Sequence, residues 1–145
     1  MIYKLYGMLP RSLRRFISQA FNARFLIGII ALVQDDEGRV LLFHSPYKHA
    51  WSLPEGFLKK GEDPKQAMLR EIKEETGVAG EALSILDAVH TADRPMLDIL
   101  ISCRLDEGLK PDGKEVSDAR FFNLKELPSD LVSTHRAYIA KYLIS

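Results

Sequence analysis

The sequence predicts an α+β domain, and three observations support this. Apolar segments of strand length recur between residues 25 and 123, a helix with clear start and stop signals lies at residues 64–76, and a second helical pattern begins near residue 133. The chain has 145 residues, of which 46% are hydrophobic and 28% are charged. These values are typical of a single globular domain with a substantial core.

Five segments are expected to form strands. Phe25 to Gln34 and Arg39 to His44 flank the turn residues Asp35 to Gly38, so we expect a β-hairpin there. Further strands are expected at residues 83–89, 96–105 and 119–123. The polar segment 106–117 reads as a long loop, and Ser133 is suited to cap the final helix.

Residues 1–24 form a basic amphipathic extension, and residues 25–145 form the main domain. Pro10 is suited to the start of a helix, and apolar residues follow at helical spacing, with arginines near the other face. We expect a helix packed on the domain or on a second subunit, which leaves a homodimer open. A membrane surface or an anionic ligand is the alternative contact.

Charge and cysteine content narrow the function classes only slightly. Twenty basic and twenty acidic residues give a formal net charge of zero, so any preference for an anionic partner has to be local. The single cysteine, Cys103, lies in an apolar run and is expected to be a buried, inert thiol, which fits a cytoplasmic location. Phe25 to Val33 is much shorter than the roughly 20 residues of a membrane span.

The helix at residues 64–76 has recognisable ends. Asp63 is a good N-cap, Pro64 suits the first helical position, and Gly77 tolerates the left-handed conformation that ends a helix. Met68 and Ile72 lie on the side expected to face the core.

Three glutamates of this helix are expected to converge. Glu71, Glu74 and Glu75 follow at i, i+3 and i+4, where like charges repel. A hard divalent cation such as Mg²⁺, or Mn²⁺ in its place, would neutralise this repulsion and binds carboxylate oxygens together with substrate phosphates. The alternative is a solvated acidic helix face.

The residues around this helix resemble a known family. Gly56, five residues, Glu62, seven residues and then the run from Arg70 to Val78 match the Nudix box at every defined position. The chain is therefore similar to the Nudix hydrolases. The resemblance implies an α/β/α sandwich with a mixed central β-sheet and a loop–helix–loop that binds metal. It also implies cleavage of the diphosphate in a nucleoside diphosphate linked to another moiety.

The resemblance also assigns roles to individual residues. By position, Glu71, Glu74 and Glu75 are metal ligands, and Glu71 or a distal acid is the general base. Arg70 and Glu62 stand where the family orients this cluster, although an ion pair between them could also be purely structural.

Residues before the box resemble the family's W-x-L-P-G-G segment, with one departure. Glu55 stands where glycine is common, and the resemblance implies that its backbone carbonyl binds metal; the alternative is that this carbonyl is not used. Trp51 and Gly56 are expected beside the substrate, with a core position as the alternative for Trp51.

Residues after the box supply further candidates. His90 lies near a strand end expected to border the substrate, with a structural histidine as the alternative. Asp98 interrupts an apolar strand and is expected to point into the cleft, with an exposed carboxylate as the alternative. Gly113-Lys114-Glu115 resembles a downstream family segment, which implies that Glu115 completes the metal shell. Glu107 is the rival ligand.

The substrate is expected to be a nucleotide-type small molecule. We favour ADP-ribose or another nucleoside diphosphate sugar over a nucleoside triphosphate, because markers of other family subclasses are absent. An RNA 5′-end pyrophosphohydrolase, with the N-terminal arginines binding the backbone, is the first alternative. A non-enzymatic nucleotide-sensing module is the second, and the intact box argues against it.

Overall fold

The structure is a computed structural model that describes residues 8–21 and 25–143. Its strands are β1 (Leu26–Val33), β2 (Val40–Ser45), β3 (Ala50–Ser52), β4 (Glu55–Phe57), β5 (Gly80–Thr91), β6 (Met96–Leu105) and β7 (Asp118–Phe122). Its helices are α2 (Arg11–Phe21), α3 (Pro64–Thr76) and α4 (Ser133–Tyr142). Among the described residues the strands form one sheet with the order β4-β1-β6-β5 and another with the order β3-β2-β7.

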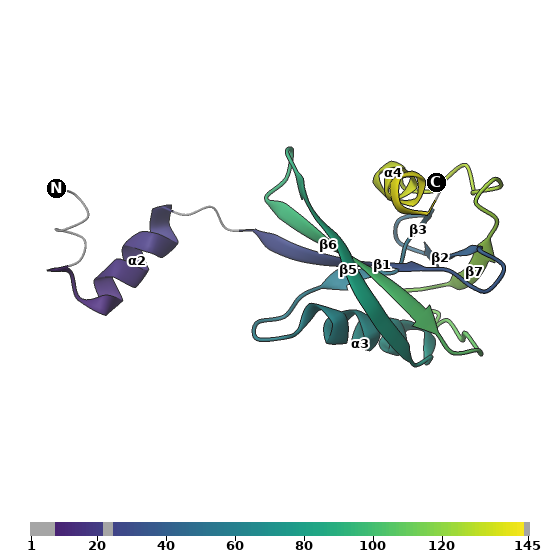
Figure 1. Ribbon diagram of the computed structural model, residues 1–145, viewed down its shortest axis with the longest axis horizontal. Helices are drawn as coiled ribbons and strands as arrows, with labels where there is room; N and C mark the ends of the chain where they lie inside the picture. Colours follow the sequence, from purple (N-terminus) through teal and green to yellow (C-terminus); the bar gives the residue numbers. More distant parts are fainter. Residues whose placement is uncertain (1–7, 22–24, 144–145) are drawn as a thin grey trace.

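The four-stranded sheet is mixed and lies between two helices. Strand β1 pairs with β6 in parallel and with β4 in antiparallel orientation, while β5 and β6 are antiparallel. Helix α3 lies on one side of the strands and α4 on the other (Figure 1). The predicted α+β fold with a mixed sheet between helices is therefore confirmed.

Alternation along β1 divides the core into two clusters. Ile29, Ala31 and Val33 pack with Met68 and Ile72 of α3. The intervening β1 residues Ile30 and Leu32 pack with Tyr138 and Ile139 of α4. Because side chains of a strand point alternately to opposite faces, one buried strand joins both helices to the sheet.

The predicted hairpin of residues 25–34 and 39–44 is wrong in its pairing. Both segments are strands, but β1 and β2 lie in different sheets and meet in a single bridge between Gln34 and Val40. Both hydrogen-bonding edges of β1 are already used by β4 and β6, so β2 pairs with β3 and β7 instead.

The ends of α3 are as predicted, whereas the start of α4 differs. The Asp63 side chain accepts hydrogen bonds from the backbone N–H groups of Lys65 and Gln66, and Gly77 ends α3 at a φ of 71°. In α4, Val132 is the N-cap and no side chain caps the first turn, so the prediction for Ser133 is wrong. Instead, the Val132 N–H donates to the Trp51 carbonyl, 2.9 Å away, and this bond fixes the entry to α4.

Part of the basic extension forms helix α2, directly after Pro10. Its predicted packing on the domain or on a second subunit stays a prediction, because residues 1–7 and 22–24 lie outside the described residues. No helix in the described ranges has the length and apolar character needed to cross a bilayer.

Candidate active site

Close contact between β4 and α3 places Glu71 at the candidate site. Gly56 of β4 faces this helix, and a Cβ atom added there would lie 2.5 Å from Cγ of Glu71. Such a contact is far shorter than the roughly 3.5–4 Å of ordinary carbon–carbon contacts. Glycine at this position therefore lets the Glu71 side chain lie directly against the strand.

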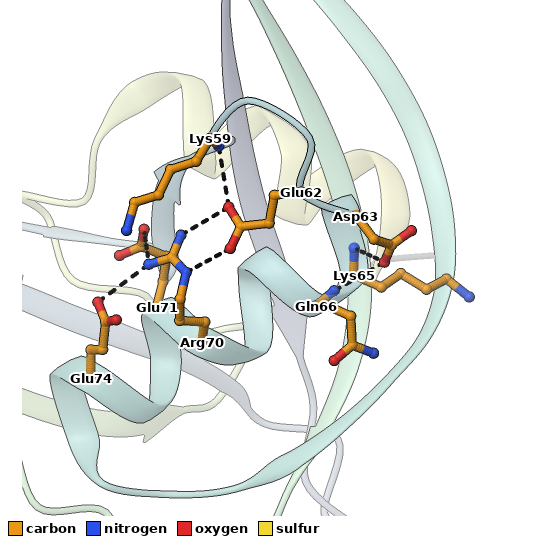
Figure 2. Close-up of polar contacts among 8 residues, drawn as sticks. All are labelled: Lys59, Glu62, Asp63, Lys65, Gln66, Arg70, Glu71 and Glu74. Carbon is orange, nitrogen blue, oxygen red and sulfur yellow. Dashed lines mark hydrogen bonds and ion pairs between the residues drawn. The ribbon is translucent and has the colours of Figure 1, made fainter.

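Arg70 connects the loop before α3 to the glutamates of the helix (Figure 2). Its Nε donates to Glu62 Oε1 at 2.7 Å and its Nη2 to Glu62 Oε2 at 3.2 Å. Its Nη1 lies 2.8 Å from Glu71 Oε1 and 3.3 Å from Glu74 Oε2. The hydrogen bonds from Arg70 hold the pKa of Glu62 below its usual value. A bidentate pair of this kind orients both partners, so Arg70 holds Glu71 in place as well as tying the loop to the helix.

Glu75 carries the least satisfied charge of the site. Among side-chain oxygens and nitrogens of the described residues, its Oε2 is the buried atom that has no hydrogen-bond partner. Burial, together with the nearby carboxylates of Glu71, Glu115, Asp112 and Glu74, raises the pKa of Glu75 to about 8. A buried carboxylate among like charges needs a cation or a proton.

The loop after β6 brings Glu115 to this carboxylate. The backbone N–H groups of Lys110 and Asp112 donate to the carbonyls of Thr76 and Glu75, at 3.0 and 2.9 Å, which fastens the loop to the end of α3. The Asp112 side chain then accepts hydrogen bonds from the N–H groups of residues 114–116 at 2.9–3.0 Å. These bonds curl the loop so that Glu115 lines the pocket, whereas Glu107 does not.

The donor set suits a divalent cation. Glu71, Glu75 and Glu115 supply hard oxygen ligands to one pocket, and the unpaired Glu75 oxygen lacks the partner that a metal ion would provide. Within residues 8–21 and 25–143, no three His, Cys, Asp or Glu side chains are already gathered as a ligand cluster. Glu71 and Glu74 are instead both paired with Arg70, and the side chain of Glu74 is 58% exposed.

A second group of side chains, which the sequence analysis missed, lies around Glu55. Lys48 forms an ion pair with the Glu55 carboxylate, and His135 Nε2 lies 3.4 Å from Glu55 Oε2. Nδ1 of His135 accepts a hydrogen bond from the Leu53 N–H at 3.0 Å, so the proton of the neutral ring is on Nε2 and points to Glu55. Burial lowers the pKa of His135 to about 4. The unusual Glu55 was the only sequence signal for this group.

The pocket itself has a volume of about 870 Å³. Six of the predicted site residues line it: Glu55, Gly56, Glu71, Glu75, Asp98 and Glu115. Arg70, Glu62 and Glu74 do not line the pocket and are linked to it by the ion pair between Arg70 and Glu71. The pocket is also lined by Lys48, His135 and Gly28, which were not predicted.

Two predicted substrate-binding residues are not brought to the pocket. Trp51 packs edge-on against Phe122 and His44, with ring centroids 4.8 and 5.3 Å apart, and Arg120 lies over its ring. This is the core position given as the alternative for Trp51. His90 is exposed and contacts the ring of Phe25 instead.

Comparison with known proteins agrees with this geometry. The model of the NUDIX domain matches residues 24–142. An ADP-ribose pyrophosphatase of Methanocaldococcus jannaschii is 30% identical over 140 residues, which cover 92% of this chain and 80% of that protein. An RNA pyrophosphohydrolase of Psychromonas ingrahamii is 32% identical over 104 residues, which cover 72% of this chain and 54% of that protein.

A solved structure shares the fold. The MutT NUDIX hydrolase of Burkholderia pseudomallei superposes with a TM-score of 0.71 at 26% identity, covering 84% of this chain and 99% of that one. Members of this family generally require a divalent metal ion, which fits the carboxylates gathered around Glu75. From its box, its fold and these relatives, the chain belongs to the Nudix hydrolase family and is a pyrophosphohydrolase.

Proposed function

We propose that the chain hydrolyses the diphosphate of ADP-ribose, or of another nucleoside diphosphate sugar, with Mg²⁺ or Mn²⁺ as the metal. The observation that carries the proposal is the unpaired, buried Glu75 oxygen in a pocket that Glu71 and Glu115 also line. The relative from Methanocaldococcus jannaschii, named an ADP-ribose pyrophosphatase, supports the substrate class.

Glu71, Glu74, Glu75 and Glu115 are the proposed metal ligands. Glu71, Glu75 and Glu115 line the pocket, and Glu74 lies one turn of α3 from Glu71 and shares Arg70 with it. A divalent ion bound there would neutralise phosphate oxygens and lower the pKa of the attacking water. The Glu55 backbone carbonyl is a further proposed ligand, since β4 forms this wall of the pocket.

The protein groups divide the remaining tasks. Glu71 or a more distant acid takes the proton of the water, a contribution typically worth about 10²–10⁴-fold. Arg70 and Glu62 keep Glu71 in position through the hydrogen bonds described above. The ammonium group of Lys48 forms an ion pair with Glu55 and interacts electrostatically with Glu75. It is therefore placed to bind a phosphate oxygen. Gly56 and Asp98 line the space for the substrate.

The proposal is tested by measuring product release from a substrate panel with Mg²⁺ and with Mn²⁺. The panel holds ADP-ribose, UDP-glucose, nucleoside triphosphates, dinucleoside polyphosphates and triphosphorylated RNA. We expect AMP and ribose 5-phosphate from ADP-ribose, and a loss of at least about 100-fold in kcat for Glu75→Gln. Glu81→Gln, the same change on an exposed part of β5, should leave the rate unchanged.

Glu115 and its rival are separated in the same assay. We expect Glu115→Gln to weaken the dependence on Mg²⁺ and Glu107→Gln to have no effect, because Glu115 alone of the two lines the pocket. Normal turnover by Glu75→Gln at saturating Mg²⁺ would contradict the ligand assignment. Turnover only of nucleoside triphosphates would contradict the substrate class.

Triphosphorylated RNA is the second candidate substrate. Helix α2 carries Arg11, Arg14 and Arg15, and the relative from Psychromonas ingrahamii is named an RNA pyrophosphohydrolase. RNA binding through these arginines should weaken steeply as salt increases, because each neutralised phosphate releases counterions. Salt-independent binding, or faster turnover of ADP-ribose than of RNA, would rule this candidate out.

A cytoplasmic location is part of the proposal and is supported by the single cysteine, Cys103, which is buried and unpaired with another cysteine. The homodimer stays a prediction, which the molar mass in solution would test.

A further inference from the structure

The pocket has a second end, away from the glutamates of α3, where three neighbouring strands meet. Gly28 of β1 pairs with Phe57 of β4 on one side and with Asp98 of β6 on the other. Residues directly opposite each other on paired strands point to the same face of a sheet. Phe57, Gly28 and Asp98 therefore form one row across the sheet, on the face that α4 covers, and all three line the pocket. We call this row the Gly28 notch.

The missing side chain of Gly28 leaves the notch open between its two neighbours. Adjacent strands lie about 4.8 Å apart, so the backbones of Phe57 and Asp98 are separated by roughly 10 Å. Phe57 is 54% exposed. Met96, two residues before Asp98, adds apolar surface at the same end, with its sulfur 3.9 Å from the position of a Cβ at Gly28.

Asp98 presents an unused hydrogen-bond acceptor to this notch. Its side chain is buried, with only 7% of the residue exposed. One oxygen, Oδ2, accepts a hydrogen bond from the Tyr138 hydroxyl at 3.2 Å. The other oxygen, Oδ1, has no hydrogen bond or ion pair with any residue that the structure describes. Asp98 lines the pocket, so this oxygen is open to a hydrogen-bond donor of a bound ligand.

The direction of this oxygen is fixed by the packing. A Cβ at Gly28 would lie 2.4 Å from Asp98 Oδ1 but 3.5 Å from its Cγ, so Oδ1 leans over Gly28 toward β4. Strand β4 also carries Gly56, which touches Glu71. Gly56 and Glu71 lie on the α3 side of this edge strand and Asp98 on the α4 side, and all of them line the same pocket. The Tyr138 hydroxyl holds the other oxygen of the carboxylate.

The chemistry of the Gly28 notch selects one kind of ligand group. A carboxylate repels phosphate, so the diphosphate belongs at the other end of the pocket. A sugar ring offers hydroxyl donors at its edge and C–H groups on its face, which match a carboxylate and an aromatic ring. Pairing of an acidic side chain with ribose hydroxyls is a general mode of nucleotide recognition.

We propose that the Gly28 notch binds the sugar attached to the distal phosphate of the substrate, with Asp98 accepting hydrogen bonds from its vicinal hydroxyl groups. This inference rests on the proposed function, because it takes the substrate to be a nucleoside diphosphate sugar. It identifies which end of that substrate occupies the notch. Asp98 is then a specificity-determining residue, and Tyr138 positions it. Gly28 is required because any side chain there would displace the accepting oxygen.

The test compares ADP-ribose with the analogue whose terminal ribose lacks its 2-hydroxyl group. For each ligand, kcat/KM is measured with Mg²⁺ and the dissociation constant is measured by calorimetry in EDTA. The wild type should prefer ADP-ribose by about 10- to 100-fold, the typical contribution of a hydrogen bond to a charged group. Asp98→Asn and Gly28→Ala should reduce this preference to within about threefold.

Two controls separate this role from a loss of folding or of chemistry. Asp93→Asn makes the same change on an exposed residue that does not line the pocket, so it should retain the preference. Thermal unfolding of each variant shows that the comparison is made on folded protein. The dissociation constants do not depend on turnover, so they test ligand binding by the notch even if ADP-ribose is not the hydrolysed substrate.

Three results would overturn the inference. The first is equal affinity of the wild type for both ligands, or no affinity for ADP-ribose. The second is a preference that Asp98→Asn leaves unchanged. The third concerns an analogue of ADP-ribose with hypoxanthine in place of adenine. If the wild type prefers ADP-ribose over this analogue and Asp98→Asn loses that preference, the carboxylate binds the base amine rather than the sugar.

Discussion

The contact between Gly56 and Glu71 gives the sharpest prediction about this site. In Gly56→Ala the new methyl carbon would lie 2.5 Å from Cγ and 2.8 Å from Cδ of Glu71. Ordinary contacts between carbons are about 3.5 Å long, so the Glu71 carboxylate has to move by about 1 Å. A displacement of that size in a reacting group costs about 100-fold in rate, or about 2.7 kcal/mol of transition-state stabilisation.

The assay measures kcat/KM on the preferred substrate together with the melting temperature. We expect kcat/KM to fall about 100-fold, while overpacking lowers stability by only about 1–3 kcal/mol. Gly38→Ala is the matched control. It replaces a glycine at a φ of 74° that has no atoms within 4 Å of the new Cβ. It should cost about 1–2 kcal/mol through backbone strain and leave kcat/KM unchanged.

The reasoning is refuted if Gly56→Ala keeps the wild-type kcat/KM. It is also refuted if both alanine variants lose activity in proportion to stability, because the loss would then reflect folding. A crystal structure of Gly56→Ala with an unmoved Glu71 would contradict the mechanism even if activity fell.

Three further predictions concern charge and burial. Burial and neighbouring carboxylates raise the pKa of Glu75 from 4.5 to about 8, so the folded, metal-free chain holds a proton that the unfolded chain releases. Its stability should therefore fall as pH rises from 5 to about 8, and Glu75→Gln should flatten this fall in thermal unfolding with EDTA; parallel curves would contradict it. Arg70→Lys should lose the bidentate contact with Glu62 and raise the Mg²⁺ concentration that gives the half-maximal rate about tenfold. An unchanged Mg²⁺ dependence would show that the ion pair is purely structural. Burial raises the pKa of the Cys103 thiol to about 12, so it should resist a thiol reagent at pH 8 until the protein is denatured; rapid labelling of native protein would disprove this.

The parts of the structure that follow from local chemistry could be predicted from the sequence. The start and end of α3 depend on Asp63 and Gly77, whose preferences act within one turn of the helix. Burial of Met68 and Ile72 follows from helical periodicity. The link between Arg70 and Glu62 was suggested only by the resemblance to the family.

The parts that depend on distant segments could not be predicted in the same way. The partner of β1 was misassigned because the choice between β2, β4 and β6 is made by packing over the whole chain. Ser133 has the right chemistry for a cap, but the backbone bond from Val132 to Trp51 fixes the start of α4 instead. The sequence left both a core position and a place at the substrate open for Trp51, and its contacts with Phe122 and His44 come from a strand pairing that periodicity does not reveal.

Glu55 shows how a departure from a family pattern can indicate new contacts before they are known. Where glycine is common, this chain has a carboxylate that faces His135 of α4 and Lys48 of the loop before β3. His135 is positioned by a buried backbone hydrogen bond from Leu53, so its direction does not depend on the substrate. The C-terminal helix therefore contacts the wall proposed to bind metal through Glu55, and the distal end of the pocket through Tyr138 and Asp98. Because both contacts come from the same helix, a change in the packing of α4 should alter substrate preference and metal dependence together.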